Sequence, residues 1–208
     1  MIAIVDYKAG NLTSVQRALE HLGLAGCVTP DPDVVRRAER IIFPGVGHAG
    51  TAMAVLKARG LDQALREAFR QGTPILGTCV GAQIVLAHSE EGDTTCLGLI
   101  DGDCERFRPA DPALKVPHMG WNEVSLVAER DHPVLRGIPD RSEFYFVHSY
   151  YLRPADPADV LATAEHGVTF PAIVGHGNLI VTQFHSEKSG PVGLQIMRNF
   201  ARWSGAAC

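Results

Sequence analysis

The sequence lacks the features that mark membrane-bound, secreted and nucleic-acid-binding proteins. Its 208 residues contain no uncharged apolar run close to the ~20 residues that cross a bilayer. The chain does not open with a charged stretch followed by an apolar one, the pattern of a secretory signal. Lys and Arg number 19 against 23 Asp and Glu and do not cluster, so a basic footprint for nucleic acid is absent. We therefore expect a cytoplasmic protein that binds neither nucleic acid nor membrane.

Cysteine is scarce and irregularly placed. The five residues, Cys27, Cys79, Cys96, Cys104 and Cys208, form an odd number and no Cys-x-x-Cys pair. This pattern disfavours a disulfide framework, a zinc ribbon and a thioredoxin-like site, and it favours a reducing compartment. Nine histidines are present without a tight metal-ligand pair such as His-Glu-x-x-His. We expect neither a metal nor a cofactor.

What the sequence does have is an ordinary globular composition, with 46% apolar and 20% charged residues. The length favours one domain spanning 1–208. In the first half, short apolar runs alternate with helical patterns, which is typical of parallel βαβ units. We predict an α/β fold with a largely parallel central sheet flanked by helices. The expected strands are 2–5, 25–29, 41–43 and 74–77, and the expected helices follow a capping box at 13–16 and cover 50–59, 61–70 and the region of 84–86.

The second half is richer in strand patterns. We expect strands within 143–152, 159–164 and 179–184, and a closing helix over 192–203 with an apolar stripe. The Pro-rich stretches 109–117 and 154–157 are typical of loops or sheet edges.

The sharpest local motif is Gly77-Thr78-Cys79-Val80-Gly81, between an apolar strand and a helix. It has the form of a nucleophile elbow with cysteine as the nucleophile. A helix N-terminus there would favour a thiolate, and its N–H groups could bind an oxyanion. A buried structural cysteine in a Gly-rich turn is the alternative.

A second motif, Phe184-His185-Ser186-Glu187, follows the apolar strand near the end of the chain. In an extended chain residues i and i+2 face the same side, so His185 and Glu187 could point together at a nucleophile. Histidine would take the thiol proton and the carboxylate would orient the imidazole. Alone, this pair is an ordinary exposed His-x-Glu; with the elbow it favours a Cys79–His185–Glu187 triad.

A third motif, Pro44-Gly45-Val46-Gly47, follows the third expected strand. Its glycines allow backbone N–H groups to approach a ligand, so it could be an oxyanion loop or a plain turn. It lacks the Gly-Lys-Ser/Thr of a phosphate-binding P-loop.

These motifs, in this order, resemble the class I (triad) glutamine amidotransferases, over essentially the whole chain. More specific segments are similar to the glutaminase subunits of imidazole glycerol phosphate synthases; they are 6–12, Val116-Pro117-His118-Met119-Gly120-Trp121-Asn122, 145–151 and 184–189. The resemblance implies that Cys79 attacks the carboxamide of L-glutamine and that His185 protonates the departing ammonia. It also implies an oxyanion hole from backbone N–H groups of Val80 and of the segment Gly45, Val46 and Gly47. Glutamine would be held by Gly47, Gln83, Glu91, His148, Ser149 and Tyr150.

The resemblance further implies a partner. In this family ammonia passes to a (β/α)8-barrel cyclase subunit, which forms imidazole glycerol phosphate and aminoimidazole carboxamide ribotide in histidine biosynthesis. Asn11, Trp121 and Lys188 are expected near that heterodimer contact, although Trp121 could be a core residue. The isolated subunit is expected to be poorly active until a ligand of the cyclase flips a peptide in the segment 44–47.

The sequence departs from the family at Ser186, where the catalytic His and Glu are usually separated by Pro. Serine forbids none of the needed geometry, so we expect the triad to survive. Two other functions stay open. A paralogous subunit could feed ammonia to a sugar-modifying synthase with the same triad. A non-catalytic redox sensor or chaperone could use the same cysteine-bearing scaffold, without need of a His-x-Glu pair.

Overall fold

A computed structural model describes residues 1–8, 11–128 and 131–206. Residues 9–10 of the resemblance segment 6–12 lie outside the described part. The described helices are all too short or too polar to cross a membrane.

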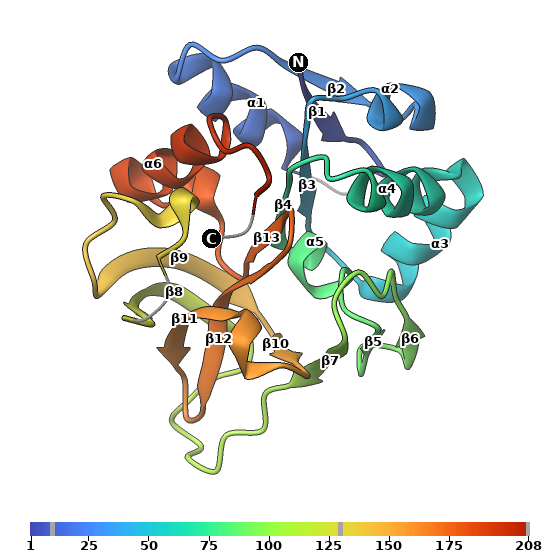
Figure 1. Ribbon diagram of the computed structural model, residues 1–208. Helices are drawn as coiled ribbons and strands as arrows, with labels where there is room; N and C mark the ends of the chain where they lie inside the picture. The colour runs from blue at the N-terminus through green and yellow to red at the C-terminus, as the bar shows by residue number, and fades with distance from the viewer. Residues whose placement is uncertain (9–10, 129–130, 207–208) are drawn as a thin grey trace.

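The large sheet has nine strands and positions the two chemical motifs on neighbouring strands (Figure 1). Five strands pair in parallel, and the remaining four continue the sheet through antiparallel pairs. The order is β2 (Gly26–Thr29), β1 (Ile2–Val5), β3 (Arg40–Gly45), β4 (Ile75–Cys79), β13 (Leu179–Thr182), β12 (Thr169–His176), β11 (Val160–Glu165), β8 (His118–Leu126) and β9 (Ser142–His148).

Helices cover both faces of the parallel half (Figure 1). Alternate strand residues serve the two cores: Phe43 packs in the core of one face, and its neighbour Ile42 packs in the core of the other. The first face carries α2 (Pro32–Arg36), α3 (Ala49–Arg59) and α4 (Leu61–Arg70), and the second carries α1 (Leu12–His21) and α6 (Gly190–Phe200).

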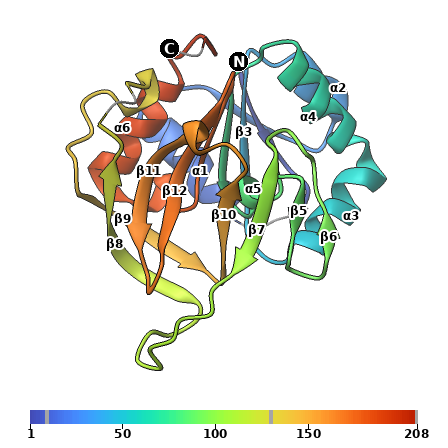
Figure 2. The same cartoon turned by 60° about the horizontal axis from the view of Figure 1, so that its bottom comes forward.

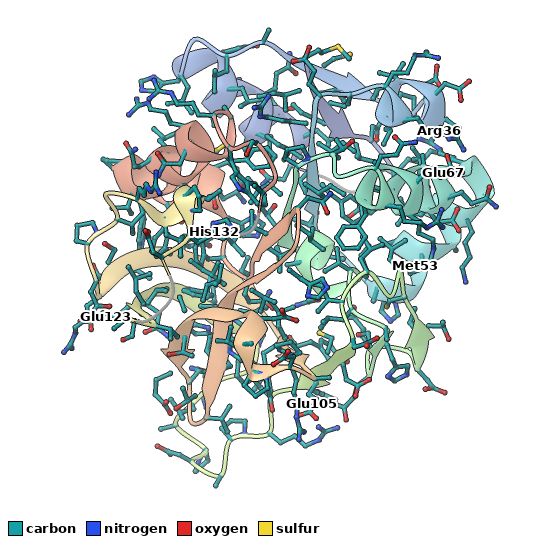
Figure 3. The ribbon with its side chains drawn as sticks, viewed as in Figure 1. Arg36, Met53, Glu67, Glu105, Glu123 and His132 are labelled. Carbon is teal, nitrogen blue, oxygen red and sulfur yellow. The ribbon has the colours of Figure 1, made fainter. Side chains whose placement is uncertain are left out.

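The helices of the first face are also tied by charge. Arg36 Nε of α2 donates to Glu67 Oε2 of α4 at 2.5 Å, at the edge seen in Figure 3. Both side chains are about one-third exposed, so solvent screens the pair and it adds little to stability. Apolar burial carries most of the packing of these helices.

A smaller four-stranded sheet lies beside the large one and is seen best in Figure 2. It contains β10 (Tyr150–Pro154), β7 (Gly102–Arg106), β5 (His88–Ser89) and β6 (Thr94–Thr95). The remaining elements are α5 (Val80–Gln83) and the 3-10 helices η1 (Pro133–Leu135), η2 (Pro157–Asp159) and η3 (Ser186–Lys188). β9 and β10 run directly into one another through Ser149, so this residue joins the two sheets.

The predicted α/β class and the flanking helices are confirmed, and α3 and α4 occur where the pattern predicts them. The predicted capping box is wrong. Helix α1 begins two residues earlier than the box predicts, at Leu12, and its N-cap is Asn11 in a left-handed conformation with φ 79°. Thr13 therefore lies inside the first turn.

Three other predicted elements also differ from the structure. Ile84, Val85 and Leu86 lie beyond α5, because their carbonyls accept hydrogen bonds from the 97–100 backbone instead of continuing a helix. Strand β3 does not stop at Phe43 but continues through Gly45, since Pro44 and Gly45 still pair with β4. The predicted strand 143–152 is divided into β9 and β10.

Candidate active site

Cys79 ends β4 and directly precedes α5, on a sharp turn. Its backbone has φ 53° and ψ −113°, a conformation that L-residues rarely adopt. The glycines on either side are required by close approach: a Cβ on Gly81 would lie 2.0 Å from the Phe43 carbonyl oxygen, and one on Gly77 would lie 2.8 Å from Val181 Cγ1. The strained cysteine between two such glycines has the geometry of a nucleophile elbow.

His185 and Glu187 form a buried pair. His185 Nδ1 lies 2.7 Å from Glu187 Oε1, and both side chains are about 1% exposed. The pair is not made by an extended chain, as the i, i+2 argument assumed. His185 is the N-cap of η3, and the 3-10 turn through Ser186 returns Glu187 to the imidazole.

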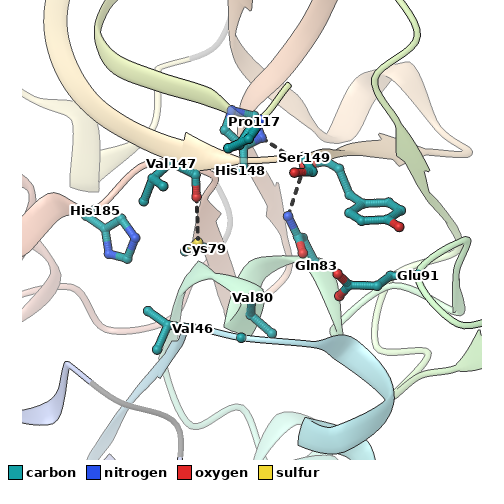
Figure 4. A pocket seen from close by; sticks show the side chains of 12 residues that line it. Val46, Cys79, Val80, Gln83, Glu91, Pro117, Val147, His148, Ser149 and His185 are labelled. Atoms are coloured by element: carbon teal, nitrogen blue, oxygen red, sulfur yellow. Dashed lines mark hydrogen bonds between the residues drawn. The ribbon is translucent and has the colours of Figure 1, made fainter. Parts of the chain in front are cut away.

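The other ring nitrogen of His185 is available for chemistry. Nε2 is buried and makes no hydrogen bond of regular geometry with the described residues, and the ring faces the cavity that holds Cys79 (Figure 4). Burial disfavours the imidazolium, but interactions with Cys79 and Glu187 outweigh burial and raise the pKa of His185 to about 9. The histidine therefore holds a proton readily when an anion forms at Cys79.

A cavity of about 290 Å³ opens above the cysteine (Figure 4). The sulfur of Cys79 lies 3.8 Å from the Val147 carbonyl oxygen and points toward it. The cavity is lined by Val46, Gly47, Cys79, Val80, Gln83, Glu91, Pro117, Val147, His148, Ser149, Tyr150 and His185. The structure thus brings most of the predicted catalytic and glutamine-binding residues to one pocket.

Gly45 lies behind this pocket rather than on its wall. It pairs in register with Cys79 across β3 and β4. A Cβ at Gly45 would lie 2.2 Å from the Tyr7 hydroxyl and 2.6 Å from the Gly81 nitrogen, so only glycine fits. Gly47 has φ 100°, a backbone conformation that favours glycine, and a Cβ built there would meet nothing within 4 Å.

One carboxylate and one amide side chain, Glu91 and Gln83, close the end of the pocket away from Cys79. Glu91 Oε2 accepts the Ala49 N–H at 2.7 Å, at the start of α3. Gln83 Nε2 donates to the Tyr150 carbonyl oxygen at 2.9 Å and to Gln183 Oε1 at 3.3 Å. A carboxylate and a fixed amide at one end, with a thiol at the other, suit an amino acid with a polar side chain.

The three residues expected at a partner contact have different surroundings: two are exposed, and the third contacts the His185–Glu187 pair. Trp121 is 55% exposed on β8 and Lys188 is exposed on η3. Asn11 instead reaches the buried pair: its side-chain amide donates to Glu187 Oε1 and lies 3.5 Å from His185 Nδ1.

Sequence reasoning missed Asn11 as a ligand of the carboxylate, and it missed Pro117 and Val147 as pocket residues. Val147 meets Cys79 through its carbonyl, which side-chain identity cannot reveal. Pro117 and Val147 do lie within the resemblance segments 116–122 and 145–151, which is the one signal that marks them.

Comparisons with known proteins agree with this geometry. The family model for glutamine amidotransferase class-I matches residues 3–203. The chain is 52% identical over 209 residues to the imidazole glycerol phosphate synthase subunit HisH of Nitratidesulfovibrio vulgaris (strain DP4), covering 98% of this chain and 96% of that protein. It is 48% identical to the subunit of the same name from Methylococcus capsulatus, covering 97% and 96%.

Solved structures share the fold at low sequence identity. A structure described as a glutamine amidotransferase superposes with a TM-score of 0.77 at 18% identity, covering 99% of this chain and 100% of that one. The structure of PurLQS from Thermotoga maritima gives 0.74 at 19% identity, covering 97% of each chain. With the family model matching nearly the whole length and relatives near half identical, this chain belongs to the class I glutamine amidotransferase family.

Proposed function

We propose that this chain is the glutaminase subunit of an imidazole glycerol phosphate synthase, acting as one catalytic domain over 1–208. The observation that carries the proposal is the meeting of Cys79, on its strained turn, with the His185–Glu187 pair in one pocket. The half-identical relatives named as subunits of that synthase support the choice of pathway, histidine biosynthesis.

The reaction begins at sulfur. With its proton on His185 Nε2, Cys79 attacks the carboxamide carbon of glutamine as a thiolate. When the tetrahedral intermediate collapses, the C–N bond breaks and His185 returns the proton to the nitrogen, which leaves as ammonia. A γ-glutamyl thioester remains on Cys79. His185 then takes a proton from water, the hydroxide attacks the thioester, and glutamate leaves as the thiol is restored.

The developing oxyanion needs N–H donors. The N–H of Val80, at the first residue of α5, is one donor. The peptides of Gly45 to Gly47 supply the other, through a peptide flip that the open surroundings of Gly47 permit. The flip would make glutaminase activity depend on a bound partner.

Glutamine is held at its other end. The Glu91 carboxylate, at the end of the pocket away from Cys79, pairs with the α-ammonium, and Gln83 with the 148–150 backbone holds the remaining polar groups. The Ala49 N–H, at the beginning of α3, fixes the orientation of the Glu91 carboxylate.

The ammonia must reach a synthase before water protonates it, so we propose a heterodimer with a (β/α)8-barrel cyclase subunit. That subunit would make imidazole glycerol phosphate and aminoimidazole carboxamide ribotide. The exposed Trp121 and Lys188, and the neighbourhood of Asn11, are proposed to lie near the contact. A biosynthetic role of this kind is consistent with the cytoplasm.

The test is glutamate release by the chain alone, with the cyclase, and with the cyclase and its ribulosyl phosphate substrate. The proposal predicts low release by the chain alone and strong activation by the complete pair. Activity that ignores this cyclase would assign the chain to another synthase, such as a sugar-modifying one. No release under any condition, with the fold intact, would favour a non-catalytic scaffold.

A further inference from the structure

A chain of hydrogen bonds runs from Asn122 in the middle of β8, through two histidines, to the wall of the pocket. Asn122 Nδ2 lies 3.2 Å from His118 Nε2, and His118 Nδ1 lies 2.9 Å from His148 Nε2. His148 Nδ1 lies 2.8 Å from the Tyr150 carbonyl oxygen. Both rings are buried, and neither takes part in the cysteine chemistry.

Backbone carbonyls fix the direction of this chain at both ends. Asn122 Nδ2 also donates to the Glu165 carbonyl at 2.9 Å, so the atom facing His118 is the nitrogen and not the amide oxygen. His118 Nε2 must therefore accept, which leaves the proton on Nδ1. At the other end, the Tyr150 carbonyl can only accept, so His148 also carries its proton on Nδ1. The two requirements agree, because His148 Nε2 is then free to accept from His118.

The Tyr150 carbonyl oxygen is the point where this chain meets the glutamine site. It accepts from His148 on one side and from Gln83 Nε2 on the other. The second proton of Gln83 Nε2 goes to Gln183 Oε1. With both of its N–H groups engaged, the Gln83 amide can interact with a substrate only through its oxygen, as an acceptor.

We propose that His118 and His148 are positioning residues for glutamine binding: as neutral Nδ1–H tautomers they form a one-way relay from Asn122 to Tyr150 that fixes one wall of the pocket. This inference rests on the proposed function. The relay holds the Tyr150 carbonyl, the carbonyl holds Gln83, and Gln83 presents an acceptor to the substrate.

The surroundings keep both rings neutral, as the relay requires. Burial lowers the pKa of His148 to about 3. The hydrogen bond to Tyr150 acts to raise this pKa, and the neighbouring histidines lower it further. Burial and His166 lower the pKa of His118 to about 4. A second proton on His118 would place an N–H against the Asn122 N–H and break the relay.

The kinetic test compares two matched substitutions in the complex with the cyclase. His118→Phe keeps a ring but removes both relay nitrogens. His166→Phe is the control. The centre of the His166 ring lies 4.3 Å from that of His118, and its one hydrogen bond among the described residues joins it to the Lys115 carbonyl, outside the relay. His118→Asn keeps a donor near the Nδ1 position and should restore part of the loss.

The proposal predicts a KM for glutamine raised about tenfold or more by His118→Phe, with kcat changed less than about threefold. His118→Asn should bring the KM part of the way back to the wild-type value, and His166→Phe should leave the KM near that value. Equal effects of the two Phe substitutions, a loss confined to kcat, or no recovery with Asn would overturn the proposal. Thermal unfolding of each variant separates these results from loss of the fold.

A second measurement does not depend on activity. Long-range proton–nitrogen NMR of ¹⁵N-histidine-labelled protein reports which ring nitrogen carries the proton. The relay predicts Nδ1–H for both His118 and His148, against the Nε2–H form that free histidine prefers. An Nε2–H signal for either residue would overturn the relay. If wild type released no glutamate with the cyclase, the proposed function would fail while this tautomer result still decided the relay.

Discussion

The side-chain amide of Asn11 donates to Glu187 Oε1, the same carboxylate oxygen that lies 2.7 Å from His185 Nδ1. The N-cap residue of α1 thus holds the carboxylate of Glu187, which lies 176 positions away in sequence. One oxygen accepts from both neighbours, so the carboxylate is locked in one orientation beneath the imidazole.

Replacing Asn11 should therefore impair catalysis more than binding. Asn11→Ala removes one bond to the carboxylate, and we expect kcat to fall about tenfold with KM nearly unchanged. Asn11→Asp should be worse than Asn11→Ala, because it sets a second carboxylate against Glu187. Steady-state glutaminase kinetics of the complex measure both. A rise in KM alone, or an Asp variant better than the Ala variant, would show that Asn11 serves another purpose.

Neutralising Glu91 should weaken substrate binding. The carboxylate is proposed to pair with the α-ammonium, and losing a charge-assisted bond costs about 1.5–3 kcal/mol. Glu91→Gln should raise the KM for glutamine about tenfold or more. The neighbouring Glu90 is a matched control, because it binds Arg108 and the Arg106 N–H outside the pocket. Glu90→Gln should leave the KM within about twofold, and equal effects of the two substitutions would count against the assignment.

The raised pKa of His185 predicts how stability changes with pH. The unfolded chain releases this proton near pH 6.5, whereas the folded chain keeps it to about pH 9. Between these values Glu187 helps to hold a proton on His185 that the unfolded chain has released, so its contribution makes the free energy of unfolding fall as pH rises.

Denaturant unfolding at pH 6.5, 7.5, 8.5 and ~9.5 measures this loss. Glu187→Gln removes one of the groups that raise the pKa, so its stability should fall less steeply across the same interval. Parallel curves for wild type and variant would mean that Glu187 does not hold the His185 proton.

Gly81, two residues after Cys79, should tolerate no side chain. A Cβ on Gly81 would lie 2.0 Å from the Phe43 carbonyl, which belongs to the paired backbone of β3 and cannot move aside. Gly81→Ala should lose about 3 kcal/mol or more of stability, measured by denaturant unfolding. Gly23→Ala is the control: Gly23 also has a positive φ but nothing within 4 Å of its Cβ, so about 1 kcal/mol is expected. Similar losses would place the cost in the backbone and not in the contact.

Local patterns predicted the elements whose formation is decided locally. Helix α4 shows an apolar spacing over ten residues, and the elbow is a short motif with its own steric logic. The start of α1 was wrong because Asn11 adopts a left-handed conformation to reach Glu187, a partner from the far end of the chain. Long-range demands of this kind leave no mark on a capping pattern.

The antiparallel half of the sheet was harder to predict. Strand β12 contains Pro171, which is tolerated because it pairs with Thr163 beside an irregularity in the β11–β12 register. Strand β8 carries His118, Trp121 and Asn122 instead of an alternating apolar pattern, since several of its residues serve hydrogen bonds or the surface. Function overrode the pattern in β8, and the register irregularity accommodates Pro171 in β12.

The central claim is that Cys79 is the nucleophile, and covalent labelling tests it most directly. A diazoketone analogue of glutamine alkylates the thiol that attacks the carboxamide carbon; intact mass and peptide mapping then locate the adduct. Burial raises the pKa of Cys96 to about 11 and that of Cys104 well above its usual value, so these thiols should stay unreactive. The account predicts one adduct, on Cys79, blocked by glutamine and absent from Cys79→Ser. An adduct on another cysteine, or cyclase-dependent glutamate release that survives Cys79→Ser, would contradict it.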